Sequence, residues 1–199
     1  EFSENNRSDF LWIIDPLDGT TFHNRGLPFF SSILALEVRG QTELGLVSSP
    51  FTGDVFLAGL GRGCTFWNRR LRKRRQVKVS GVTNLADVLV GYSYGKSEQH
   101  ARHMAATLGG LFPMCRAIMR LGGAEIGYVA SGACDAFIDN NSTPWDFAAV
   151  TLMVREAGGR VTDFAGREWT KKSDSIVASN GALHRKVLNR LPPVATTAG

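Results

Sequence analysis

The sequence has few cysteines and no long apolar run. Its three cysteines, Cys64, Cys115 and Cys134, are widely spaced and form neither a disulfide framework nor a CxxC metal pattern. We therefore expect a reducing compartment, the cytoplasm. The longest apolar stretches, such as residues 29–36 (FFSSILAL), fall far short of the roughly 20 residues that cross a bilayer. We expect no membrane segment, and since no N-terminal stretch pairs basic residues with an apolar run, no signal peptide.

The chain has little excess charge outside one segment. Its 199 residues include 23 Lys and Arg against 18 Asp and Glu, a net charge of +5. Six of these bases lie in residues 69–75 (RRLRKRR), and the 23 bases less these six leave 17, fewer than the 18 acids. Such a run can bind nucleic acid, but this one lacks interleaved aromatic residues apart from Phe66 and Trp67 just before it. We favour a solvated loop and expect no nucleic-acid partner, with a nucleic-acid-binding module as the rival.

The hydrophobic pattern predicts a folded chain of mixed α/β class without internal repeats. A hydrophobic content of 43% is too high for a disordered chain. An antiparallel meander is expected first, with strands at residues 11–14, 29–38, 43–49 and 54–58 and a polar, hairpin-like excursion at 59–75. Strands and helices then alternate, with strands at residues 88–91, 135–138 and 176–178 and helices at 98–108, 124–130, 144–157 and 182–191. Residues 1–80 and 81–199 are expected to form two halves of one compact body.

The most informative segment is residues 15–21 (DPLDGTT), where two carboxylates follow a predicted buried strand. Asp15 and Asp18 offer oxygen ligands of the kind that suit a hard cation such as Mg²⁺. Gly19 permits close backbone approach, and the residues after it could open a helix whose N–H groups bind phosphate. The plain alternative is a turn and a helix cap, because Asp-Pro and Asp-Gly are common turn dipeptides.

A second acidic position strengthens the case for a metal site. Asp146, in Pro144-Trp145-Asp146, stands at the start of the helix that ends at Gly158-Gly159. Capping alone would explain an aspartate there. If the fold brings it to the first pair, however, three carboxylates beside helix N-termini would form a metal and phosphate site.

Residues 12–21 (WIIDPLDGTT) together with 145–159 (WDFAAVTLMVREAGG) resemble the paired motifs of the inositol monophosphatase family of Mg²⁺-dependent phosphomonoesterases. The similarity continues through residues 120–124 (RLGGA) and 176–181 (IVASNG), so it spans nearly the whole chain in the right order. It implies the family's layered α-β-α-β-α sugar-phosphatase fold, with the first helical layer largely missing here. That absence would leave an apolar sheet face exposed.

The resemblance also implies roles for individual residues. The metal ligands would be Asp15, the Leu17 backbone carbonyl, Asp18, Asp146 and Glu1. Thr20, Asp18 and Glu1 would be catalytic, with Thr20 orienting the attacking water. The substrate would be bound by Gly19, Thr20, Gly122, Gly123, Ala124, Asp139 and Asp146. Family members have a Gly-Glu-Glu motif upstream of the first aspartates, and the resemblance implies that Glu1 would be one of its two glutamates.

The implied function is hydrolysis of a small sugar or polyol phosphate, inositol monophosphate first, by metal-activated water, in a homodimer. Two departures keep alternatives open. Asp139 stands where many members have a glutamate, and could equally be a surface turn residue; Phe22-His23 replaces the frequent Asn-Phe. The alternatives are a histidinol-phosphate or fructose-bisphosphate phosphatase of the same family, or a catalytically impaired phosphate-binding fragment.

Overall fold

The structure, a computed structural model, describes residues 8–120 and 125–192. Its first sheet has six antiparallel strands in chain order: β1 (Phe10–Asp18), β2 (Ser31–Val38), β3 (Gln41–Ser49), β4 (Asp54–Gly59), β5 (Gly63–Asn68) and β6 (Lys73–Val77). The predicted meander is confirmed. The segment expected to be a polar excursion instead contributes β5 and β6 to this sheet, because Cys64 and Val77 are buried on its inner face.

The second sheet is mixed and has the order β10-β11-β9-β7-β8. Its strands are β7 (Leu89–Ser93), β8 (Ala117–Met119), β9 (Ala136–Asp139), β10 (Gly159–Thr162) and β11 (Ile176–Asn180). β7 runs parallel to β8 and β9, whereas β11 is antiparallel to β9 and β10. The helices among the described residues are α1 (Thr20–His23), the 3-10 turn η1 (Leu85–Asp87), α2 (Glu98–Leu111), α3 (Glu125–Ala130), α4 (Pro144–Glu156) and α5 (Gly181–Leu188).

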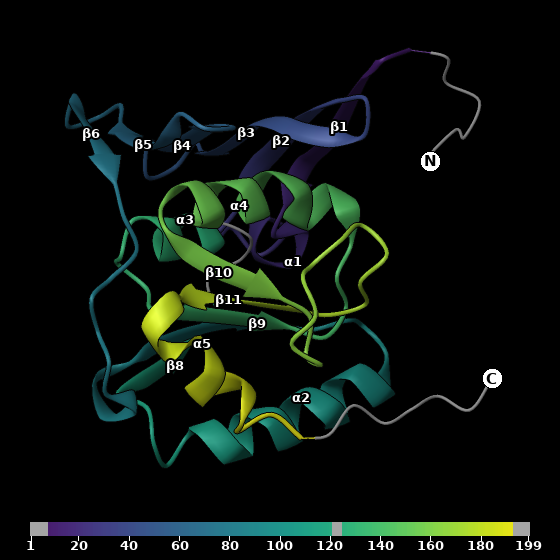
Figure 1. Ribbon diagram of the computed structural model, residues 1–199, viewed down its shortest axis with the longest axis vertical. Helices are drawn as coiled ribbons and strands as arrows, with labels where there is room; N and C mark the ends of the chain where they lie inside the picture. Colours follow the sequence, from purple (N-terminus) through teal and green to yellow (C-terminus); the bar gives the residue numbers. More distant parts are fainter. Residues whose placement is uncertain (1–7, 121–124, 193–199) are drawn as a thin grey trace.

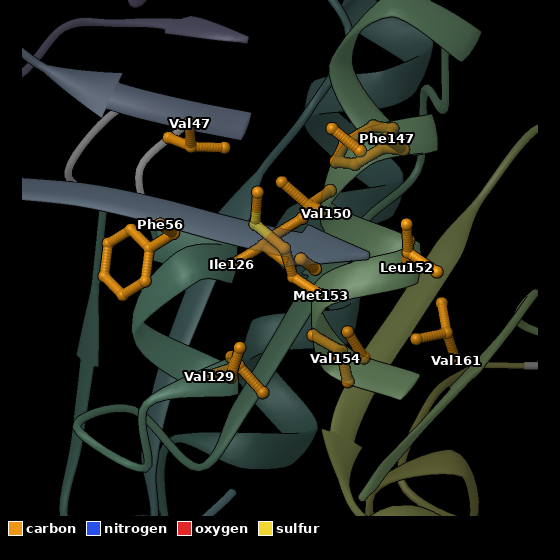
Figure 2. Packing of buried hydrophobic residues seen from close by; sticks show 14 of the residues in the cluster. Val47, Phe56, Ile126, Val129, Phe147, Val150, Leu152, Met153, Val154 and Val161 are labelled. Carbon is orange, nitrogen blue, oxygen red and sulfur yellow. The ribbon is translucent and has the colours of Figure 1, made fainter. Parts of the chain in front are cut away.

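The elements stack in layers (Figure 1): the first sheet, then α3 and α4, then the second sheet, then α2 and α5. α4 is apolar almost all round because it lies between the two sheets, and eight consecutive residues from Phe147 to Val154 are buried. Figure 2 shows part of this core, where Val47 and Phe56 of the first sheet lie beside Val150 and Met153 of α4. A second cluster joins the other face of the second sheet to α2 and α5.

The outer face of the first sheet carries apolar side chains that the described residues leave exposed. On β1 the exposed positions alternate with buried or partly buried ones, and Phe10, Trp12 and Ile14 are at least half exposed. This period of two places them on the face opposite α4. The mixed α/β class and the sparse first helical layer are thus as expected. Within the described ranges, no helix is both long and apolar enough to span a bilayer.

Candidate metal centre

The first pair of aspartates lies at an irregular end of β1. Pairing with β2 shifts register between Asp15 and Asp18, because Pro16 has no N–H for a regular ladder. The Asp15 carboxylate accepts the N–H of Leu17 at 3.0 Å, and the Ser32 hydroxyl donates to the Pro16 carbonyl at 2.8 Å. β1 therefore continues to Asp18 instead of ending before Asp15 as predicted, and the bulge sets both carboxylates at one edge of the sheet.

Gly19 makes the chain turn from β1 into α1. Its φ of 79° lies in the left-handed region, and a Cβ there would be 2.5 Å from the carbonyl oxygen of Phe29. Only glycine fits this position. The hydroxyl of Thr20, the first residue of α1, donates to the Leu17 carbonyl at 3.1 Å. The turn thus links the two residues predicted as water-orienting group and backbone ligand.

The third aspartate comes from the start of α4. The N-cap is Thr143 and not Asp146: its hydroxyl accepts the N–H of Asp146 at 3.4 Å and donates to the Asp146 carboxylate at 2.5 Å. Pro144 occupies the first helical position, where its missing N–H costs no hydrogen bond. Because the Thr143 hydroxyl caps the helix, the Asp146 carboxylate is not needed as the cap. The same hydroxyl holds this carboxylate by a hydrogen bond.

The fold brings the three predicted carboxylates together. Each of Asp15, Asp18 and Asp146 offers an oxygen, and these oxygens all lie within 4.8 Å of one another; all three residues are partly buried. Burial raises the pKa of the Asp146 carboxyl, and the neighbouring Asp18 and Asp15 carboxylates raise it further, while the Thr143 hydrogen bond opposes the rise. Three converging carboxylates repel one another, and a cation would offset this repulsion.

Asp139 lies near this cluster at the end of β9. Its carboxylate is buried and accepts the Asn141 N–H at 2.6 Å. Burial raises the pKa of Asp139 to about 6; the Asn141 and Ser93 hydrogen bonds and the charge of Arg120 lower it, and the Asp18 carboxylate raises it. The Asp18 carboxylate is thus one of the charges that act on Asp139. A buried, hydrogen-bonded carboxylate differs from the surface turn residue that the sequence left open.

Arg120 places a positive charge near Asp139, a role that the sequence did not indicate. Its guanidinium lies 4.6 Å from the ring centre of Tyr94 and 5.7 Å from that of Phe22 in α1. Both distances are typical of cation–π contacts. For the contact between Arg120 and Phe22, the sequence offered one indication: Phe22 directly follows the DPLDGTT turn. Nothing in the sequence indicated Tyr94 or Ser93, because they reach the site from β7 and the residues after it.

The remaining predicted residues lie outside the described ranges. They are Glu1, Gly122, Gly123 and Ala124. The described residues nevertheless fit a divalent cation: the donor set is carboxylate oxygen with a nearby backbone carbonyl, which suits Mg²⁺ better than a softer metal. Such an arrangement can neutralise charge on a phosphoryl group and orient a water beside it.

Comparison with known proteins finds relatives that match nearly the whole chain. A model of the inositol monophosphatase family matches residues 2–194. The chain is 38% identical over 182 residues to Nus factor SuhB of Salmonella typhimurium strain LT2, covering 90% of this chain and 66% of that protein, and 37% identical over 187 residues to Nus factor SuhB of Escherichia coli K12, covering 93% and 68%. The chain thus spans slightly less than two thirds of the Salmonella relative.

Solved structures give the same result. The extragenic suppressor protein suhB of Bartonella henselae superposes with a TM-score of 0.86 at 32% identity, covering 96% of this chain and 74% of that one. The Thermotoga maritima IMPase superposes with a TM-score of 0.84 at 32% identity, covering 94% and 70%.

Proposed function

Because the chain belongs to the inositol monophosphatase family, we propose that it is a Mg²⁺-dependent phosphomonoesterase acting on a small sugar or polyol phosphate, with inositol monophosphate as the first substrate to test. One observation carries the proposal. The oxygens of Asp15, Asp18 and Asp146 converge within 4.8 Å although the third aspartate comes from a distant helix. A fold that maintains such a repulsive cluster gains from a bound cation.

In this proposal Asp15, Asp18, Asp146 and the Leu17 carbonyl hold the metal. When bound, Mg²⁺ supplies positive charge that favours ionisation of a nearby water and stabilises charge on the phosphoryl group. The carboxylates are held in place by the fold: the N–H of Leu17 fixes Asp15 and the Thr143 hydroxyl fixes Asp146. Fixed ligands need no rearrangement when the substrate arrives.

The Thr20 hydroxyl orients the attacking water in this proposal. Its proton is donated to the Leu17 carbonyl, so its lone pairs remain to accept a hydrogen bond from the water. The N–H groups of Gly19 and Thr20 bind the phosphate. The left-handed backbone of Gly19 and its close packing against Phe29 support this role, because they leave no room for a side chain at this turn.

Asp139 accepts hydrogen bonds from hydroxyl groups of the substrate in this proposal. The N–H of Asn141 and the side chain of Ser93 hold its carboxylate, and Arg120 adds positive charge nearby. Its side chain is one methylene shorter than the glutamate common in the family, so the polyol must approach β9 more closely. Substrate choice is therefore the part of the proposal that needs a panel of phosphates.

The test is release of orthophosphate from inositol 1-phosphate, histidinol phosphate, fructose 1,6-bisphosphate and 3′-phosphoadenosine 5′-phosphate, with and without Mg²⁺. We expect Mg²⁺-dependent release that is lost in Asp15→Asn and kept in Asp87→Asn, a matched change at an exposed aspartate on η1. Full activity of Asp15→Asn would overturn the metal assignment. Phosphate binding without turnover on any substrate would favour the catalytically impaired alternative. The homodimer stays a prediction, for which light scattering after gel filtration gives the mass.

A further inference from the structure

The basic run lies on a firmly braced hairpin formed by β5 and β6. Asn68, the last residue of β5, donates from its amide to the Asp54 carboxylate at 2.6 Å, and its amide oxygen accepts the N–H of Leu71 at 2.7 Å. The other oxygen of Asp54 accepts the Tyr128 hydroxyl at 2.7 Å. The hairpin tip is thus tied to the sheet and to α3, so its side chains project from a fixed support.

All six bases of the run are exposed. They are Arg69, Arg70, Arg72, Lys73, Arg74 and Arg75. Among the residues that the structure describes, the six ion pairs involve none of them. No carboxylate of the described residues therefore forms an ion pair with them, and five of the six are arginines, whose planar guanidinium binds phosphate in a bidentate manner.

Two aromatic rings lie against arginines of the run: Trp67, which directly precedes it in sequence, and Phe51, which the fold brings to it from the turn after β3. The guanidinium of Arg69 lies 5.8 Å from the Trp67 ring centre, and that of Arg70 lies 5.4 Å from the ring centre of Phe51. Trp67 is 43% exposed and Phe51 is 52% exposed. Half-exposed rings beside free arginines are the combination with which proteins bind single-stranded nucleic acid, by stacking bases and pairing phosphates.

A cavity of about 410 Å³ lies where this hairpin meets the turn after β3. It is lined by Ser48, Ser49, Pro50, Gly53, Arg69 and Arg70. The turn is close to the hairpin: the N–H of Arg69 donates to the Gly53 carbonyl at 2.7 Å, and a Cβ on Gly53 would lie 2.8 Å from Cγ of Arg70. The cavity has the size of a ligand site and combines hydroxyl groups with guanidinium donors, which suits a phosphate group.

Protection of an exposed strand edge does not account for this surface. Charged residues on an edge strand prevent pairing with other chains, and this explains the bases of β6. It does not explain Arg69 and Arg70, which precede β6 and line the cavity, nor the rings beneath them. The hairpin is on the far side of the sheet from the acidic cluster, because β1 and β6 are opposite edges of a six-stranded sheet (Figure 1), about 24 Å apart at the usual strand spacing. The β3 side of the cavity, at Ser48 and Ser49, lies only two strands from β1.

We propose that the β5–β6 hairpin, with the turn at residues 50–53, binds single-stranded nucleic acid. The arginines pair with backbone phosphates, the cavity holds one phosphate beside Arg69 and Arg70, and bases stack on the exposed rings of Trp67 and Phe51. Recognition rests on phosphates and ring faces, so it is tolerant of base sequence. A membrane surface is disfavoured because a flat bilayer would not fill the cavity between the turn and the hairpin.

The experiment is fluorescence anisotropy of labelled 12-nucleotide DNA and RNA single strands of mixed sequence, titrated with the full chain at several salt concentrations. Each phosphate contact contributes about −0.7 to the slope of log K against log salt for single strands. The triple variant Arg69→Gln, Arg70→Gln, Arg74→Gln should bind at least about tenfold more weakly and reduce the magnitude of the slope by about 2. Trp67→Ala should weaken binding roughly tenfold with an unchanged slope.

A matched control removes the same charge elsewhere. Arg102→Gln, Arg116→Gln, Arg185→Gln changes three exposed arginines outside the hairpin and should leave affinity and slope close to those of the unchanged chain. Equal losses in the two triple variants would overturn the proposal in favour of general charge attraction. Retention on phosphatidylserine vesicles without oligonucleotide binding would overturn it in favour of a membrane surface, and unchanged binding by Trp67→Ala would overturn the stacking contribution.

Discussion

The hydroxyl of Thr143 and the carboxylate of Asp146 are joined at 2.5 Å, and the same hydroxyl accepts the N–H of Asp146. The Thr143 side chain therefore both caps the N-terminus of α4 and holds a candidate metal ligand. The stability of α4 and the geometry of the acidic cluster depend on the same threonine.

Thr143→Ala should lower the free energy of unfolding by about 1 kcal/mol, since it removes the N-cap. It should also weaken Mg²⁺ binding, because the hydrogen bond that favours the charged form of Asp146 is lost. Thr143→Ser should retain both properties. Urea unfolding and calorimetric titration with Mg²⁺ measure them. Asp146→Asn is the complementary variant: it keeps the cap and should lose only the metal. Mg²⁺ affinity in Thr143→Ala equal to that of the unchanged chain would contradict this account.

Asp15→Asn should raise the free energy of unfolding when no metal is present. The change removes one charge from three converging carboxylates, and like charges about 4–5 Å apart in a partly solvated site repel by on the order of 1 kcal/mol. Asparagine keeps an oxygen that can accept the N–H of Leu17. With Mg²⁺ the order should reverse, because only the unchanged chain gains binding free energy. Thermal unfolding in a chelator and in Mg²⁺ compares the two; a lower midpoint for Asp15→Asn in both conditions would rule out the repulsion.

Lys171→Met should destabilise the fold by about 3 kcal/mol. Glu37 points to the inner face of β2 with 3% of its side chain exposed, and Lys171 pairs with it at 2.5 Å. Loss of the lysine leaves a buried carboxylate without its charge partner. The double variant Glu37→Leu, Lys171→Met should recover most of that loss, because no charge then remains buried. Urea unfolding of the single and double variants tests this, and equal stability of the two would show that the pair contributes only packing.

His184 should make the protein less stable as the pH falls from about 6.5 towards 4. Burial lowers the pKa of His184 to about 4, with a smaller effect from Arg160, whereas in the unfolded chain the imidazole titrates near 6.5. Between these values the unfolded state binds more protons, so acid favours unfolding by up to about 1.4 kcal/mol per pH unit. The raised pKa of Asp139 acts in the opposite direction, so the readout is the difference between the unchanged chain and His184→Gln, measured by urea unfolding at pH 4.5 to 7.5.

A His184→Gln profile parallel to that of the unchanged chain would exclude the imidazole as the source of the pH dependence. An absolute loss of stability in the variant is expected in any case. His184 lies between the hydroxyls of Thr162 and Ser179, at 2.9 Å and 2.8 Å, and glutamine cannot reproduce both contacts.

Much of the fold could be predicted from sequence because its signals are local. Apolar alternation located the strands of the first sheet, and helical spacing that stops at Gly158-Gly159 located α4. Sequence patterns were less informative where tertiary packing decides whether a segment forms a strand. β5 and β6 read as a polar excursion because only single positions, such as Cys64 and Val77, face the core. The glycines near residue 60 gave no indication that the Glu156 carboxylate accepts the N–H groups of Gly61 and Gly63, at 2.8 Å and 2.7 Å.

The sequence by itself singled out Asp15, Asp18 and Asp146 as candidate metal ligands, because they stand at a turn after a strand and at a helix start, in motifs that resemble those of the family. Only the tertiary structure decided that their oxygens meet within 4.8 Å, and that Arg69 and Arg70 lie over exposed rings beside a cavity. The physical reason is the same in both cases. Distances between residues far apart in the chain are set by how sheets and helices pack on a shared core, and no local pattern encodes them.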